Sequence, residues 1–109
     1  MFVTDYILNH DPGYFKERLA KESVSKLFAF GSSLHSNNPK DIDLLIEIEG
    51  NDPLIKGESL INLWDFFEKY FKRKVDLLTP SCLKNPYLRD EIESSKQLIY
   101  AKGQQEVFA

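Results

Sequence analysis

Two aspartates at alternating positions of one apolar segment are the residues of this chain whose spacing could support chemistry. The segment, residues 41–49, reads DIDLLIEIE. Successive side chains of a β-strand point to opposite faces, so Asp41 and Asp43 would share one face while the isoleucines pack on a core. The two carboxylates would lie roughly 6–7 Å apart, twice the rise per residue of a strand. Like charges at that separation are tolerated when water screens them or when a divalent cation binds between them. The pattern therefore predicts either an amphipathic strand with an acidic outer face or part of a metal site.

A turn of small residues precedes this segment and could bind phosphate. The apolar run 27–30 predicts a short buried strand, and Gly31, Ser32 and Ser33 follow it directly. Glycine lets backbone N–H groups approach an anion because it has no Cβ. The serines add hydroxyl donors, and a helix that starts there would direct its positive end to the same place. A phosphate-binding turn facing a metal-binding acidic pair is what phosphoryl or nucleotidyl transfer requires.

Together with a third aspartate, these features resemble the signature of the minimal nucleotidyltransferases (MNT) of the polymerase-beta superfamily. That family has a Gly-Ser turn, a loop, two aspartates separated by one residue, and a further carboxylate on a later strand. Here Asp76, in the segment KVDLLT at 74–79, stands in that last place. The resemblance covers about residues 12–101 and implies a polymerase-beta-like α/β (α+β) core, a small mixed sheet with helices mainly on one face.

The resemblance also implies roles for these residues. Asp41, Asp43 and Asp76 would be catalytic and would bind one or two Mg²⁺ ions, and Gly31, Ser32 and Ser33 would bind the nucleotide. The substrate would be ATP or another nucleoside triphosphate, from which a nucleoside monophosphate, first of all AMP, is transferred to a hydroxyl group.

The acceptor is expected to belong to a partner, because this chain has no further domain to complete the site. Stand-alone proteins of this type act as antitoxins that transfer AMP to a tyrosine of a helical HEPN-type toxin. Such a toxin is therefore the expected partner, and a second copy of this chain is the alternative.

Two other functions remain open from the sequence. The loop between Ser32 and Asp41 has eight residues, fewer than is usual in the family, and it lacks the Arg-Gly pair often found there. A catalytically weak or inactive antitoxin, which keeps the fold and acts by complex formation, would suit this departure. An acidic strand face alone would suit a metal-binding or calcium-binding protein.

Composition indicates one globular domain over residues 1–109. The chain is 42% hydrophobic and 13% aromatic, with a net charge of −3 and one cysteine. The charge argues against binding to nucleic-acid backbones, and a single cysteine excludes an internal disulfide framework. No run approaches the ~20 apolar residues of a membrane span, and no signal peptide is recognisable, so we expect a cytoplasmic protein.

Local patterns predict the elements that must position these residues. Strands are expected near 27–30, 41–49, 74–79 and 98–101, while residues 1–10 could be a short strand or a tether. Helices are expected from Pro12 behind the N-cap Asp11, from about Lys56 to Lys72, and over 87–94 after Asn85-Pro86. Residues 102–109 are expected to form a loose tail.

Several side chains carry specific expectations about burial. Ile61 and Phe66 either extend the apolar face of a helix that is buried deeply against the sheet, or they belong to a surface patch that contacts a second protein. The basic residues 72–74 are expected to lie in solvent at the end of a helix, where they offset the helix dipole. The alternative is that one of them attracts a triphosphate toward the site. The inward-facing residues expected in the second and third helices are Leu60, Leu63, Trp64, Phe67, Tyr70 and Phe71, and then Leu88 and Ile92.

Overall fold

Four strands form the central sheet of this protein. The computed structural model describes residues 2–36 and 38–103, apart from the side chains of Ser32 and His35. The strands are β1 (Val24–Phe30), β2 (Asp41–Ile48), β3 (Lys74–Leu78) and β4 (Gln97–Ala101), and they lie in the order β3-β2-β1-β4. β1 is antiparallel to β2 and β4, whereas β2 and β3 are parallel. The predicted small mixed sheet is therefore confirmed.

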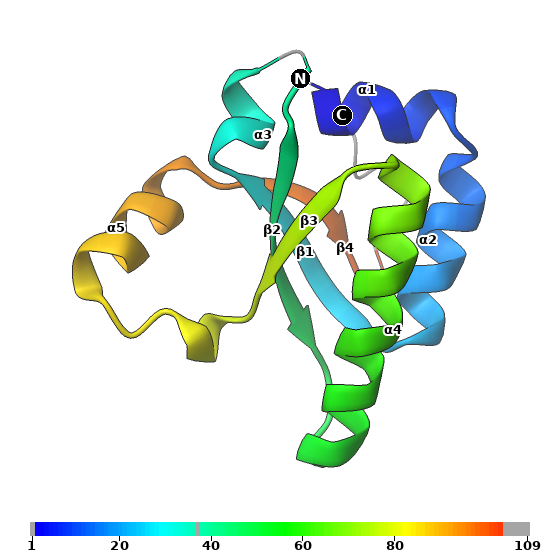
Figure 1. The fold of residues 1–109 in the computed structure, drawn as a ribbon. Coiled ribbons are helices and arrows are strands. Elements are labelled where there is room, and N and C mark those ends of the chain that lie inside the picture. Colours follow the sequence, from blue (N-terminus) through cyan, green and yellow to red (C-terminus); the bar gives the residue numbers. More distant parts are fainter. Residues whose placement is uncertain (1, 37, 104–109) are drawn as a thin grey trace.

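Most helices cover one face of the sheet. These are α1 (Phe2–Asn9), α2 (Pro12–Lys21) and α4 (Pro53–Phe71), which lie to the right of the sheet in Figure 1. Their apolar side chains share one core with the sheet, whose members include Val3, Ile7, Phe15, Leu19, Leu63, Phe67, Ile42, Leu44, Val75 and Leu77.

The opposite face carries a smaller cluster. The short 3-10 helix η1 (Pro80–Cys82) and α5 (Pro86–Ser95) lie on this side, to the left in Figure 1. The buried members of the cluster are Phe28, Leu45, Leu83 and Ile92. α3 (Ser32–His35) connects β1 to β2 at one end of the sheet. This arrangement agrees with the prediction of helices mainly on one face.

Three helices begin where a capping side chain meets a proline. The Asp11 carboxylate accepts the Tyr14 N–H at 3.1 Å, as expected from the sequence. The Asn85 side chain accepts the Tyr87 N–H at 2.9 Å, at the expected start of a helix. Asp52 caps α4 in the same way by accepting the Leu54 N–H at 2.9 Å. Because this cap stands directly before Pro53, α4 begins three residues earlier than the predicted start at Lys56.

The N-terminal segment is a helix, so the expected strand or tether at residues 1–10 is wrong. Val3 and Ile7 are four residues apart and both fully buried, which is the spacing of one helix face. The Tyr6 hydroxyl donates to the Tyr70 carbonyl at 2.8 Å, and the Tyr70 hydroxyl donates to the His10 carbonyl at 2.6 Å. These contacts hold α1 against the end of α4.

Ile61 and Phe66, which were expected either to be buried or to form a surface patch, have different environments in α4. Phe66 is 9% exposed and belongs to the core, whereas Ile61 is 70% exposed. A surface patch made of both residues is therefore wrong.

Trp64 differs from the prediction because it packs beside the edge strand β3 and remains 42% exposed. Its Nε1 donates to the Val75 carbonyl at 2.6 Å, and the Val75 N–H donates to Glu68 at 3.1 Å. α4 thus covers backbone groups that an edge strand would otherwise leave open.

The C-terminal elements agree with the prediction in part. Ile92 is buried in α5 as expected and packs with Phe28 and Leu45 of the sheet, but Leu88 is 43% exposed. Lys102 is bound to the sheet, since its N–H donates to the Ser25 carbonyl and its ammonium pairs with Glu49, both at 2.9 Å. The rest of the expected tail, from residue 104 on, lies outside the described residues. No helix in the described part of the chain is long and apolar enough to cross a membrane.

Replacing Phe67 by alanine tests the importance of the main core. Phe67 is fully buried and its ring centroid lies 5.8 Å from that of Phe15. The substitution is expected to lower the free energy of unfolding by about 3–5 kcal/mol, measured by urea denaturation. Ile61→Ala on the same helix is the control, with an expected change within about 0.5 kcal/mol because the side chain is exposed. Equal losses in the two variants would contradict this description of the core.

Candidate active site

Asp43 and Asp76 are direct partners across the parallel strands β2 and β3. Their Cα atoms are therefore about 4.8 Å apart, the spacing of neighbouring strands, and both side chains lie on the same face. Asp41 lies on that face two residues earlier, and its partner in β3 is Lys74. Their neighbours Ile42 and Val75 point to the main core, so the aspartates face the opposite side of the sheet. The fold thus brings the three predicted carboxylates to one end of one sheet face.

Gly31 ends β1 and lies against the Asp43 side chain. Its φ is +63°, and a Cβ at this position would come within 2.6 Å of Asp43 Oδ2. Any larger residue would therefore displace the Asp43 carboxylate and also adopt a conformation that L side chains rarely take. The glycine is needed here for two reasons, namely the turn and the close approach to the carboxylate.

Ser33 holds the backbone of Asp43. Its side chain is fully buried, and its Oγ accepts the Asp43 N–H at 2.7 Å and donates to the Asp43 carbonyl at 3.4 Å. Because the hydroxyl already has these partners, the group that Ser33 can offer a phosphate is its backbone N–H. The nucleotide-binding roles of Gly31, Ser32 and Ser33 stay predictions, and the side chain of Ser32 lies outside the description.

The three aspartates fit Mg²⁺ in chemical type and in backbone position. Carboxylate oxygens are the ligands that Mg²⁺ prefers, and one or two of them commonly suffice when a phosphate supplies the others. Within residues 2–36 and 38–103, however, no three His, Cys, Asp or Glu side chains are grouped closely enough to hold a metal ion. Asp41 and Asp76 are exposed. Metal binding at this site remains a prediction.

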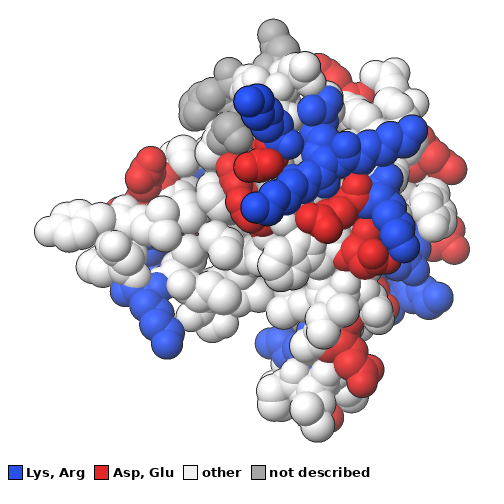
Figure 2. Space-filling model, in the orientation of Figure 1, with Lys and Arg blue, Asp and Glu red and all other residues white. Residues whose placement is uncertain are grey.

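Positive charge lies close to these carboxylates. Lys40, Lys72 and Lys74 are exposed, and Figure 2 shows Lys and Arg side chains gathered over the end of α4 and the start of β3, with acidic side chains beside them. Lys72 and Lys74 agree with the predicted solvated helix end. Arg73 does not, because it is partly buried and its guanidinium donates to the loop before β2. Sequence reasoning missed this residue, since nothing local to 72–74 indicates a contact with residues 38–39.

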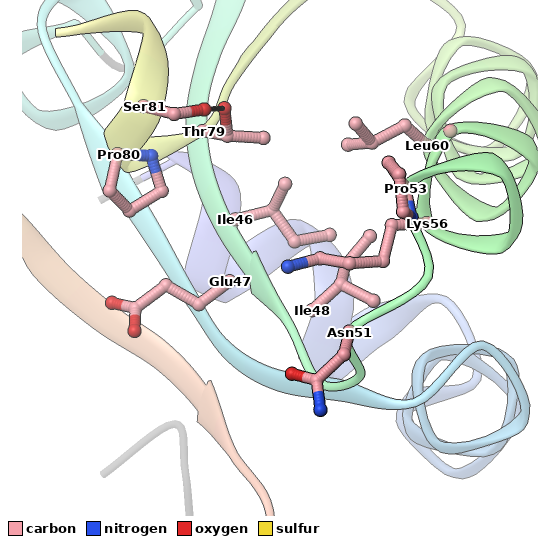
Figure 3. Close-up of a pocket in the computed structure, with 11 residues that line it drawn as sticks. Ile46, Glu47, Ile48, Asn51, Pro53, Lys56, Leu60, Thr79, Pro80 and Ser81 are labelled. Atoms are coloured by element: carbon pink, nitrogen blue, oxygen red, sulfur yellow. Dashed lines mark hydrogen bonds between the residues drawn. The ribbon is translucent and has the colours of Figure 1, made fainter.

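A groove lies further along β2, beside the start of α4. It has a volume of about 630 Å³ and is formed by the end of β2, the first turns of α4 and η1. Figure 3 shows Ile46, Ile48 and Leu60 directed toward the space between β2 and α4. Ile48 is five residues from Asp43 along β2, which corresponds to roughly 16 Å. Ile46 and Thr79, which also line the groove, are each three residues from an aspartate, roughly 10 Å along the strand, so the groove begins beyond the carboxylates.

The chain is similar in sequence to known nucleotidyltransferases. The family described as "Polymerase beta, Nucleotidyltransferase" matches residues 14–105. Two proteins of Methanocaldococcus jannaschii, MJ1379 and MJ0126, are named as candidate protein adenylyltransferases, and each is 34% identical to this chain. The alignment covers 73% of this chain and 79% of MJ1379, and 78% of this chain and 84% of MJ0126. The family match spans the Gly31 turn and all three aspartates.

Solved structures share the fold at lower sequence identity. A chain of a toxin-antitoxin crystal structure with AMP-PNP matches with a TM-score of 0.55 and 16% identity, over 86% of this chain and 76% of that chain. A chain from a complex of tri-AMPylated Shewanella oneidensis HEPN toxin with MNT antitoxin matches with a TM-score of 0.53 and 16% identity, over 88% and 72%. These likenesses confirm the predicted fold.

Replacing Gly31 by alanine tests the contact with Asp43. The positive φ is expected to lower the free energy of unfolding by about 1–2 kcal/mol, and the new Cβ should move the Asp43 carboxylate. Urea denaturation measures the first effect, and the NMR shift of the Asp43 carboxylate carbon measures the second.

Gly57→Ala is the matched control for this substitution. Gly57 lies inside α4, and a Cβ there would meet nothing within 4 Å. This variant is expected to gain about 0.5–1 kcal/mol from higher helix propensity. A Gly31→Ala protein as stable as the Gly57→Ala protein, with an unmoved Asp43 signal, would contradict the described geometry.

Proposed function

Because this chain belongs to the polymerase beta nucleotidyltransferase family, we propose that it transfers AMP from ATP to a hydroxyl group of a partner protein. The observation that carries the proposal is the pairing of Asp43 with Asp76 across β2 and β3, beside the Cα of Gly31. Two carboxylates from neighbouring strands, next to a turn whose glycine leaves room for one of them, would supply the positioned negative charge that metal-assisted nucleotidyl transfer needs.

The reaction must overcome the negative charge of the triphosphate, which repels an incoming nucleophile. Mg²⁺, held by Asp41, Asp43 and Asp76, would neutralise part of this charge and lower the pKa of the attacking hydroxyl. The three carboxylates come from two neighbouring strands of one sheet, which fixes the spacing of their backbone positions.

The remaining steps use groups of the chain itself. As an alternative to binding the metal, Asp76 could accept the proton of the incoming hydroxyl directly, because it is exposed on the edge strand β3. The acceptor oxygen forms a bond to the α-phosphorus of ATP, and the bond from that phosphorus to the β-phosphate oxygen breaks. Backbone N–H groups at Gly31, Ser32 and Ser33 would hold the departing pyrophosphate.

The proposed acceptor is a tyrosine on a helical HEPN-type toxin, for which this chain would be the antitoxin. The names of the two archaeal relatives support a protein as the acceptor. The fold shared with a chain from a complex of AMPylated HEPN toxin and MNT antitoxin supports the kind of partner. The exposure of Asp41 and Asp76 leaves this end of the sheet accessible to a side chain of another protein. Consumption of ATP agrees with a cytoplasmic location.

Label transfer from ATP tests the proposal. The protein is incubated with Mg²⁺, ATP labelled at the α-phosphate, and a purified HEPN-type protein, and label on the partner is measured. Asp43→Asn is expected to lower the rate by about 10³-fold or more, because the carboxylates act as a unit. Glu47→Gln is the matched control, since Glu47 lies four residues further along the same strand face, roughly 13 Å away, and should retain the rate.

Other outcomes identify the alternative functions. Tight binding of the partner by the wild-type protein without label transfer would indicate an antitoxin that acts by complex formation. Divalent-metal affinity that does not depend on nucleotide, together with absence of transfer, would indicate a metal-binding protein. Either result would overturn the proposed transfer reaction.

A further inference from the structure

Arg73 connects the starts of the two strands that carry the aspartates. It directly precedes β3, and its guanidinium reaches the loop that precedes β2. Nη1 donates to the Pro39 carbonyl at 2.7 Å, and Nη2 donates to the Asn38 side-chain oxygen at 2.7 Å. Pro39 is only two residues before Asp41, so the guanidinium acts close to the first aspartate.

The guanidinium is itself held in place by α1. Its Cζ lies 4.5 Å from the centroid of the Phe2 ring, a geometry in which an arginine stacks favourably on an aromatic face. Tyr6 and Tyr70 bind α1 to the end of α4, two residues before Lys72. The family match begins at residue 14, so Phe2 and α1 lie outside the matched region.

We propose that Arg73 is a positioning residue that fixes Asp41 relative to Asp43 and Asp76. Like charges on these three side chains repel one another, and Asp41 is the first residue of β2, where a strand is most easily displaced. The two hydrogen bonds hold the backbone just before it. This inference rests on the proposed nucleotidyl transfer for its purpose, but the contact itself can be tested without nucleotide.

The geometry favours arginine over lysine at this position. The two acceptors belong to neighbouring residues and require two N–H donors in a fixed plane, which a guanidinium provides and a single ammonium does not. The neighbours Lys72 and Lys74 are exposed, so the general charge of this region does not depend on Arg73 alone.

The experiment compares Arg73→Met, Arg73→Lys and the control Lys69→Met in protein without ATP or partner. Lys69 lies near the end of α4, pairs with Asp65 and is 77% exposed, so its removal deletes the same charge without the loop contact. Two quantities are measured: amide hydrogen exchange over residues 40–44, and the Kd for Mn²⁺, which reports on the three carboxylates.

Arg73→Met is expected to increase exchange over residues 40–44 and weaken Mn²⁺ binding, each by about tenfold or more. Arg73→Lys should lie between Arg73→Met and the wild type, and Lys69→Met should match the wild type. Added methylguanidinium should recover part of the Mn²⁺ affinity of Arg73→Met. Asn38→Ala removes one of the two acceptors at an exposed position and should show a smaller effect of the same kind. It replaces Arg73→Met in the comparison if that variant does not fold.

In the transfer assay, Arg73→Met should lower kcat and recover part of it at high Mg²⁺, with little change in KM for ATP. Wild-type exchange and Mn²⁺ affinity in Arg73→Met and Asn38→Ala would overturn the role of Arg73. Equal weakening of Mn²⁺ binding in Lys69→Met would also overturn it, because the effect would then be one of overall charge. Absence of transfer by the wild-type protein, in contrast, counts against the proposed function and not against this contact.

Discussion

The parallel pairing of β2 with β3 is the constraint on which the candidate site depends, because it places Asp76 beside Asp43. A shift of this pairing by one residue would turn Asp76 into the core and bring Val75 to the surface. The fold opposes such a shift in two ways. Val75 packs in the main core, and α4 binds its backbone through Trp64 and Glu68. The contacts that stabilise the sheet therefore also set the spacing of the two carboxylates.

The residues around the aspartates act mainly on the backbone that carries them. Gly31 leaves room for the Asp43 carboxylate, Ser33 binds the Asp43 backbone, and Arg73 binds the loop before Asp41. Fixing the backbone keeps side chains that repel one another in position.

The elements of the fold follow from local patterns to different degrees. The alternation in residues 41–49 and the caps at Asp11 and Asn85 predicted β2, α2 and α5 closely, since strand period and helix capping depend on adjacent residues. Burial was harder to predict. Trp64 and Leu88 have the spacing of core residues but are partly exposed. Whether a side chain is covered depends on which element packs over it, and this is set by distant parts of the chain.

The same division holds for the site. Residue types and their spacing could be read from the sequence: paired aspartates on one strand face, a third aspartate on a later strand, and a glycine at the end of the strand before them. Three contacts appear only in the folded protein: Asp76 pairs with Asp43, the Ser33 hydroxyl bonds to the Asp43 backbone, and Arg73 binds the loop before Asp41. Residue type and short-range periodicity depend on adjacent residues, whereas strand register and side-chain hydrogen bonds across the fold arise when separate elements pack together.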